Sequence, residues 1–284
     1  MIPSAFEYSR AVSVDDALAK LRAANGAAKL IAGGHSLIPA MKFRLSQPAA
    51  LIDISRIPEL SGIRSKDGSV EIGAGTIHHV VATSKVLRDT CPVIADTAAT
   101  IGDPQVRHCG TIGGSIAHAD PSADYPAALL ALDASIHIKG PNGARGVKAR
   151  DYFRGLFTVD LAADEIIIAV QFTPVRAAAY AKLYQRASHF AIVGVAAALD
   201  VSGGVIKSAR IGVTGASSHA TRLTDVESAL AGKPASAATI TQAVRNAGAA
   251  MEDINSDIHA SAEYRRAMIP VFTERALRSA LERV

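Results

Sequence analysis

Two short Gly-Gly stretches constrain this sequence more than any other feature. Residues 32–36 read Ala-Gly-Gly-His-Ser, and residues 111–115 read Thr-Ile-Gly-Gly-Ser. Glycine has no Cβ, so a positive φ costs little and backbone N–H groups can approach a ligand closely. Successive outward N–H groups form a concave anion site, to which a hydroxyl adds a neutral donor. Two such loops predict a clamp for a pyrophosphate, whereas the ordinary alternative for a Gly-Gly pair is a simple turn.

The size and charge of the chain exclude several classes of protein. Its 284 residues are enough for about two domains with separate cores. A net charge of +4 from dispersed basic residues gives no patch of the kind that binds nucleic acid. The two cysteines, Cys91 and Cys109, lack metal-ligand spacing, so we expect no disulfide framework, zinc site or iron–sulfur cluster. No signal-peptide pattern and no membrane-length apolar run are present, which predicts a cytoplasmic chain without a transmembrane segment.

Apolar periodicity and capping residues predict the elements of the first 175 residues. Ser13 and Asp16 form a capping box, and apolar residues then recur at helical spacing until Asn25 and Gly26 end the helix. We predict strands at residues 28–32, 51–54, 70–74, 134–139, 145–147 and 165–172, and helices at 92–100 and 125–132. The two glycine loops follow the strand at 28–32 and the helix at 92–100.

The last third of the sequence has a different order of elements. Strands are expected at residues 180–185, 192–200 and 209–213, with Gly203 and Gly204 in one turn. Helices follow at residues 225–230, 236–249 and from about 262 onward. Strands followed by helices indicate an α+β module, with a boundary near residues 174–176.

Competing motifs for other chemistries are absent. Gly73-Ala74-Gly75 lacks the third glycine of a dinucleotide fingerprint, and no Gly-x-Ser-x-Gly elbow occurs. Five histidines, none at the spacing of a helical zinc site, are best interpreted as solvated or hydrogen-bonded side chains; these are His35, His78, His79, His108 and His118. We expect no metal site and no catalytic residue in this chain.

The residues around the glycine loops carry a resemblance to a known family. Residues 103–110, Asp-Pro-Gln-Val-Arg-His-Cys-Gly, lead into the second loop, and residues 117–126, Ala-His-Ala-Asp-Pro-Ser-Ala-Asp-Tyr-Pro, leave it. Together with residues 32–36 they closely resemble the FAD-binding medium subunits of the molybdenum hydroxylases, in particular those of aerobic carbon monoxide dehydrogenases. The resemblance covers essentially the whole chain. It implies an α+β fold with a two-subdomain FAD-binding domain of the PCMH/VAO type at residues 1–175, divided at about residue 58. It also implies a C-terminal domain at residues 176–284 with a three-stranded antiparallel sheet and helices.

The resemblance also implies positions that contact FAD. Asp124 would accept hydrogen bonds from the polyol chain of the flavin, although on sequence alone it is equally a cap or turn residue. Phe190 would lie beside the isoalloxazine ring, or else be an ordinary core aromatic. Gln185 aligns near a lysine of some relatives, which leaves its role open. The pyrophosphate would be held by Ile31, Ala32, Gly33, Gly34, His35, Ser36, Leu37, Thr111, Ile112, Gly113, Gly114 and Ser115, with Ile101 near the adenine and Ile167 near the isoalloxazine.

The function implied by the resemblance is an electron relay. FAD on this chain would pass electrons from the [2Fe-2S] clusters of a small subunit to an external acceptor. A large subunit with the molybdenum cofactor would carry out the chemistry on carbon monoxide, an aldehyde or an N-heterocycle. We expect a dimer of heterotrimers. The alternatives are a self-sufficient FAD oxidoreductase with its own substrate pocket, and a flavin-free structural subunit, which would leave both glycine loops unexplained.

Overall fold

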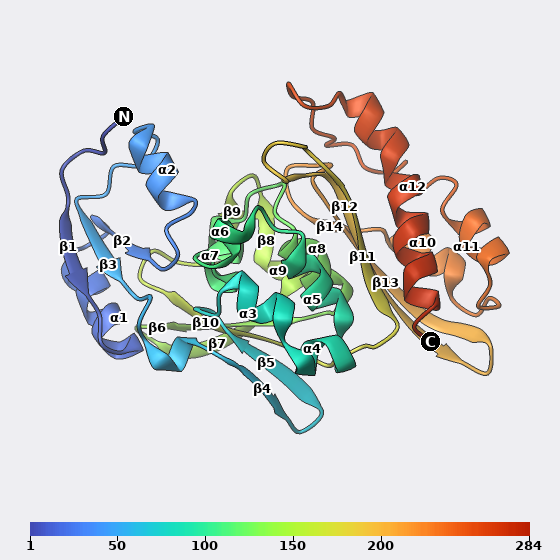
Figure 1. Ribbon diagram of the computed structural model, residues 1–284, viewed down its shortest axis with the longest axis horizontal. Helices are drawn as coiled ribbons and strands as arrows, with labels where there is room; N and C mark the ends of the chain where they lie inside the picture. Colours follow the sequence, from blue (N-terminus) through green and yellow to red (C-terminus); the bar gives the residue numbers. More distant parts are fainter.

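Three parts follow one another along the longest axis of the computed structural model, which describes residues 1–284 (Figure 1). Each part has its own sheet and its own cluster of buried apolar side chains. The α+β fold class predicted from the sequence is confirmed. None of the helices combines the length and the apolar character needed to cross a membrane.

The first part is a three-stranded parallel sheet with strand order β1-β3-β2, covered by helix α1. Ser13 caps α1 as predicted, because its side chain accepts a hydrogen bond from Asp16 N at 3.1 Å. One face of α1, formed by Val14, Ala17, Leu18 and Leu21, is buried in the core of this part. The elements are β1 (Glu7–Arg10), α1 (Val14–Ala23), β2 (Ala28–Ile31), α2 (Leu37–Lys42), β3 (Ala50–Asp53) and the 3-10 helix η1 (Pro58–Leu60).

The central part is built on a five-stranded antiparallel sheet with order β4-β5-β10-β6-β7. Ile166 of its middle strand β10 (Ile166–Phe172) belongs to the core of the first part, so the two parts share packing. The other strands of this sheet are β4 (Ile63–Lys66), β5 (Ser69–Gly73), β6 (Ser135–Gly140) and β7 (Gly143–Lys148). The short strands β8 (Phe153–Gly155) and β9 (Thr158–Val159) form a separate two-stranded sheet. The helices are α3 (His78–Thr83), α4 (Lys85–Thr90), α5 (Pro92–Ala99), α6 (Pro104–Arg107), α7 (Ile112–His118), α8 (Tyr125–Ala131) and α9 (Ala149–Tyr152).

The C-terminal part has three long antiparallel strands, with the two-residue strand β14 added at one edge. The helix predicted at residues 236–249 ends at Ala243, so the prediction of its end was wrong. Its continuation is replaced by turns closed by hydrogen bonds between residues i and i+3, and Gly248 has φ +76°, which a right-handed helix cannot contain. The elements are β11 (Ala178–Tyr184), β12 (Ala191–Ser202), β13 (Val205–Thr214), β14 (Thr221–Arg222), α10 (Thr224–Leu230), α11 (Ala237–Ala243) and α12 (Ala262–Leu281).

Helix α8 joins the central part to the C-terminal part. All seven of its residues are buried, which explains why its sequence is apolar on every face. One face of the C-terminal sheet lies directly on it, since a Cβ at Gly212 would lie 2.2 Å from Ala127 O. Helix α12 covers the same sheet from the other side (Figure 1). Asp124, the residue just before α8, therefore lies where the two parts meet.

Candidate flavin site

The two glycine loops lie against each other although 73 residues, 38–110, separate them in the sequence. The first glycine loop, residues 31–37, connects β2 to α2, and the second, residues 111–115, begins α7. A Cβ on Gly33 would lie 2.1 Å from Cys109 O and 2.8 Å from Gly110 Cα, just before the second loop. The first part and the central part thus meet at glycine backbone, at a distance that no side chain would permit.

The first glycine loop presents an unbroken run of backbone donors. No oxygen atom of the chain accepts a hydrogen bond from the N–H groups of residues 32–37. Gly34 has φ +71°, the left-handed conformation that glycine adopts without strain. The loop is half-buried or exposed along its length, so these donors are accessible. A run of unpaired N–H groups in a turn is the arrangement that binds anionic oxygens.

The second glycine loop is organised differently. Its N–H groups are mostly used inside the chain: Gly113 N donates to Ala74 O at 2.8 Å, and Gly114 N to the Thr111 hydroxyl at 3.0 Å. Neither glycine has a positive φ. Gly113 instead allows α7 to lie close to β5, since a Cβ there would be 2.5 Å from the Ala74 Cβ. The expectation that this loop turns its amides outward is therefore wrong, and the half-buried Ser115 hydroxyl is its free donor.

His78 contacts the segment that leads into the second glycine loop. Its backbone N donates to Gly110 O at 2.9 Å, and its Nδ1 lies 3.2 Å from the hydroxyl of the buried Tyr125. Burial, together with the nearby positive charges of His35 and Arg107, lowers the pKa of His78 to about 4. The interpretation of this histidine as a hydrogen-bonded side chain is confirmed, but its place under the second loop was not predicted.

Asp124 is buried between the central and C-terminal parts. It occupies the N-cap position of α8, as the cap alternative predicted, but its side chain makes no cap hydrogen bond to the helix. Its carboxylate accepts a hydrogen bond from the Tyr180 hydroxyl at 2.6 Å and forms an ion pair with Lys182 Nζ at 2.8 Å. Tyr180 and Lys182 both lie on β11. Burial raises the pKa of Asp124, and Lys182 and Tyr180 oppose that shift. The sequence analysis missed both partners, although their two-residue spacing on a strand places them on one face.

Gln185 and Phe190 form the two ends of the tight loop between β11 and β12. Gln185 N donates to Phe190 O at 2.9 Å, which closes the loop. His189 Nδ1 lies 3.1 Å from Gly102 O, so the loop rests on the segment that contains the half-buried Ile101. Phe190 is 49% exposed, and the alternative of a core aromatic is therefore wrong.

Comparison with known proteins places this geometry in a family. Residues 4–174 match the family described as FAD binding domain in molybdopterin dehydrogenase, and residues 178–280 match the CO dehydrogenase flavoprotein C-terminal domain. The chain belongs to the FAD-binding subunits of the molybdenum hydroxylases. The resemblance predicted from the sequence is confirmed.

The similarity to individual members extends over the full chain. The carbon monoxide dehydrogenase medium chain of Hydrogenophaga pseudoflava is 39% identical, over 100% of this chain and 99% of the relative. The 6-hydroxypseudooxynicotine dehydrogenase complex subunit alpha of Paenarthrobacter nicotinovorans is 37% identical, over 100% and 97%. A solved structure of the Hydrogenophaga pseudoflava enzyme, in a form lacking the Mo-pyranopterin moiety, superimposes with a TM-score of 0.95 at 40% identity, covering 100% of this chain and 99% of that one.

The flavoprotein subunit brings most of the predicted site residues into two neighbouring groups. One group is the pair of glycine loops, and the other consists of Asp124, Gln185 and Phe190 around the segment of Ile101. Ile167 is different, because it is 6% exposed and lies in the central core at the β-bulge of β10. A role for Ile167 beside the isoalloxazine stays a prediction.

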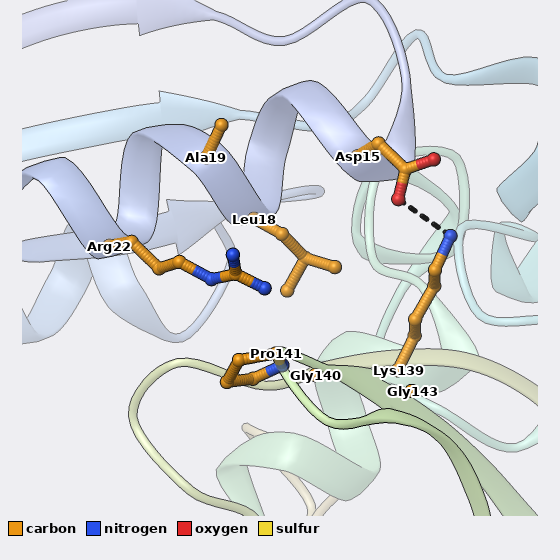
Figure 2. A pocket seen from close by; sticks show the side chains of 8 residues that line it. All are labelled: Asp15, Leu18, Ala19, Arg22, Lys139, Gly140, Pro141 and Gly143. Carbon is orange, nitrogen blue, oxygen red and sulfur yellow. Dashed lines mark hydrogen bonds and ion pairs between the residues drawn. The ribbon is translucent and has the colours of Figure 1, made fainter.

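A surface hollow of about 310 Å³ lies apart from these groups, between α1 and the β6–β7 hairpin (Figure 2). Asp15 on α1 pairs with Lys139 on β6 at 2.6 Å, and Leu18 and Arg22 line the hollow from the same helix. No predicted site residue lines it. Its ion pair joins the first and central parts, which carry the first and second glycine loops respectively.

Proposed function

We propose that this flavoprotein subunit binds FAD with the pyrophosphate on the first glycine loop, and relays electrons from iron–sulfur clusters of a partner subunit to an external acceptor. The observation that carries the proposal is the run of unpaired N–H groups at residues 32–37, held against the second loop by the Gly33 contact. FAD supplies the redox chemistry, because it accepts two electrons and releases them singly or in pairs.

The residues of the chain bind and orient the cofactor. The N–H groups of the first loop and the Ser115 hydroxyl suit pyrophosphate oxygens, which accept hydrogen bonds but donate none. The half-exposed Phe190 offers an aromatic face to a flat ring. Asp124 keeps acceptor capacity for a polyol hydroxyl, since a carboxylate has about four acceptor positions and only Tyr180 and Lys182 donate hydrogen bonds to it. We assign these contacts to residues 1–175 as the FAD-binding domain, completed by residues 176–284.

The self-sufficient oxidoreductase is not favoured. The relatives that match over their full length are named as a medium chain and as a subunit of a dehydrogenase complex. The partners we propose are a molybdenum-binding large subunit and an iron–sulfur small subunit, assembled as a dimer of heterotrimers in the cytoplasm. The large subunit would then decide whether carbon monoxide, an aldehyde or an N-heterocycle is oxidised.

Reconstitution of the purified chain tests cofactor binding. The chain is incubated with FAD or with FMN, desalted, and denatured so that the released flavin can be identified by chromatography. FAD should be retained at one per chain. FMN carries a single phosphate instead of the pyrophosphate. It should be lost on desalting, because the first loop would then bind one phosphate group instead of two. Equal retention of FMN, or no retention of either flavin, would contradict the proposal.

A further inference from the structure

Lys182 is a buried cation that bridges the FAD-binding and C-terminal parts. Its side chain is 4% exposed, and that of its partner Asp124 is 5% exposed. The ammonium group donates to Asp124 Oδ2 at 2.9 Å and to Thr100 O at 3.1 Å, and it lies 2.8 Å from Asp124 Oδ1. Three oxygen atoms thus lie within hydrogen-bond distance of an ammonium group that has three donors. The Lys182 ammonium group is therefore held in place by oxygen atoms of the chain rather than hydrated by solvent.

The contacts of Lys182 reach both sides of the candidate flavin site. Thr100 precedes Ile101, and Asp124 immediately precedes α8. Strand β11 continues from Lys182 to the loop of Gln185 and Phe190, which is itself tied to Gly102 through His189. Lys182 thus links the strand that leads to the exposed Phe190, in the C-terminal part, to the carboxylate of Asp124 in the central part.

The surroundings of Asp124 give the lysine a second effect. The charged and titratable groups around the carboxylate are Lys182 and Tyr180 on β11, Tyr125 on α8 and Asp120 in the preceding turn. Lys182 is the only cation among them. A buried carboxyl without a cation takes up a proton, because burial disfavours the charged form. Removal of Lys182 would turn an acceptor of hydrogen bonds into a group that donates one.

We propose that Lys182 is a positioning residue of the flavin site, which keeps Asp124 as a fixed, ionised acceptor for a hydroxyl of the flavin polyol chain. This inference rests on the proposed binding of FAD. It adds a residue that touches no cofactor and acts through Asp124 and the Phe190 loop.

The test measures the Kd for FAD from pH 6 to 9 in the full chain and in three variants. In Lys182→Met, Asp124 should be protonated at pH 6, so that FAD binds about tenfold more weakly than to the unaltered chain, and ionisation toward pH 9 should restore most of the affinity. The double variant Asp124→Asn/Lys182→Met has a neutral pair and should bind about tenfold more weakly at every pH. Lys85→Met is the matched control, since Lys85 forms an exposed ion pair with Asp89.

A purely structural lysine would give a different result. Urea unfolding would then show a less stable Lys182→Met protein, while its Kd for FAD stayed equal to that of the unaltered chain at every pH; this would overturn the inference and leave the proposed function intact. If Lys182→Met does not fold, the double variant decides, because unaltered affinity in that protein overturns the inference as well. An unaltered chain that binds no FAD would instead contradict the proposed function itself.

Discussion

Replacing Gly33 by alanine tests whether the meeting of the two glycine loops creates the pyrophosphate site. Gly33 does not have a positive φ, so alanine can adopt its backbone conformation without strain. The obstacle is the new Cβ, which would lie 2.1 Å from Cys109 O, where real Cβ atoms stay beyond 3.0 Å. Both sides of the contact are backbone, so the loops must separate by roughly 1 Å.

That separation sets the size of the expected effect. An N–H···O bond of 2.9 Å lengthened by about 1 Å is no longer a hydrogen bond. Loss of two such bonds to a charged phosphate oxygen costs about 3 to 6 kcal/mol, since each contributes about 1.5 to 3 kcal/mol. The Kd for FAD should therefore rise by roughly 10²- to 10⁴-fold in Gly33→Ala.

Fluorescence titration with FAD measures the Kd, and urea unfolding monitored by circular dichroism measures the stability of the same samples. Gly146→Ala is the control. Its new Cβ would meet only the His137 ring, at 3.9 Å, and Gly146 lies on the edge strand β7, outside both glycine loops. The control should bind FAD as the unaltered chain does. A Gly33→Ala protein that is folded and has an unaltered Kd would refute the reasoning, because the loops would then not hold the cofactor together.

Three further predictions concern His78, Phe190 and Arg265. The pKa of His78 falls from 6.5 to about 4 on folding, so between these pH values the unfolded chain binds a proton that the folded chain excludes. The contribution of His78 to the free energy of unfolding is therefore fully present above pH 6.5. It should fall by about 3 kcal/mol as the pH is lowered from 6.5 to 4. Urea unfolding across this range should show a smaller fall in His78→Gln, and identical falls would contradict the assignment. Phe190→Ala should weaken FAD binding by about 1 kcal/mol with little loss of stability, because the ring is 49% exposed; an unaltered Kd and flavin spectrum would exclude contact with the ring. Arg265→Met should lower the free energy of unfolding by about 3 kcal/mol, since the buried guanidinium donates to Ile192 O and Gly215 O, and a loss below about 1 kcal/mol would show that water replaces it.

Local signals in the sequence predicted most elements but not how they pair. The Ser13 cap, the apolar periodicity of α1 and the strand alternation of β6 depend on neighbouring residues, which the sequence displays directly. The order of strands in the central sheet depends on contacts between distant segments. β10, the last strand of that sheet in the chain, lies in its middle, and no local pattern indicates this position.

The two glycine loops show the same limit within the site. Their sequences look equivalent, yet only the first has an unbroken run of free N–H groups, because Ala74 and Thr76 accept hydrogen bonds from the second. The partners of Asp124 lie 56 and 58 residues away on another part of the fold. The sequence could therefore name the loops and Asp124, whereas the division of roles between the loops and the place of Lys182 required the three-dimensional arrangement.

Reduction of the bound flavin by a molybdenum-enzyme substrate tests the relay most directly. The FAD-loaded chain is mixed anaerobically with carbon monoxide, an aldehyde or an N-heterocycle, first alone and then with the proposed large and small subunits, and the flavin absorbance is followed. The chain contains no cluster of three or more His, Cys, Asp or Glu side chains that could hold a metal ion, and the relay proposal places the substrate chemistry on the large subunit. Its flavin should therefore stay oxidised alone and bleach with one of these substrates when both partners are present. Bleaching of the lone chain at the rate of the complex would contradict the relay and favour a self-sufficient oxidoreductase.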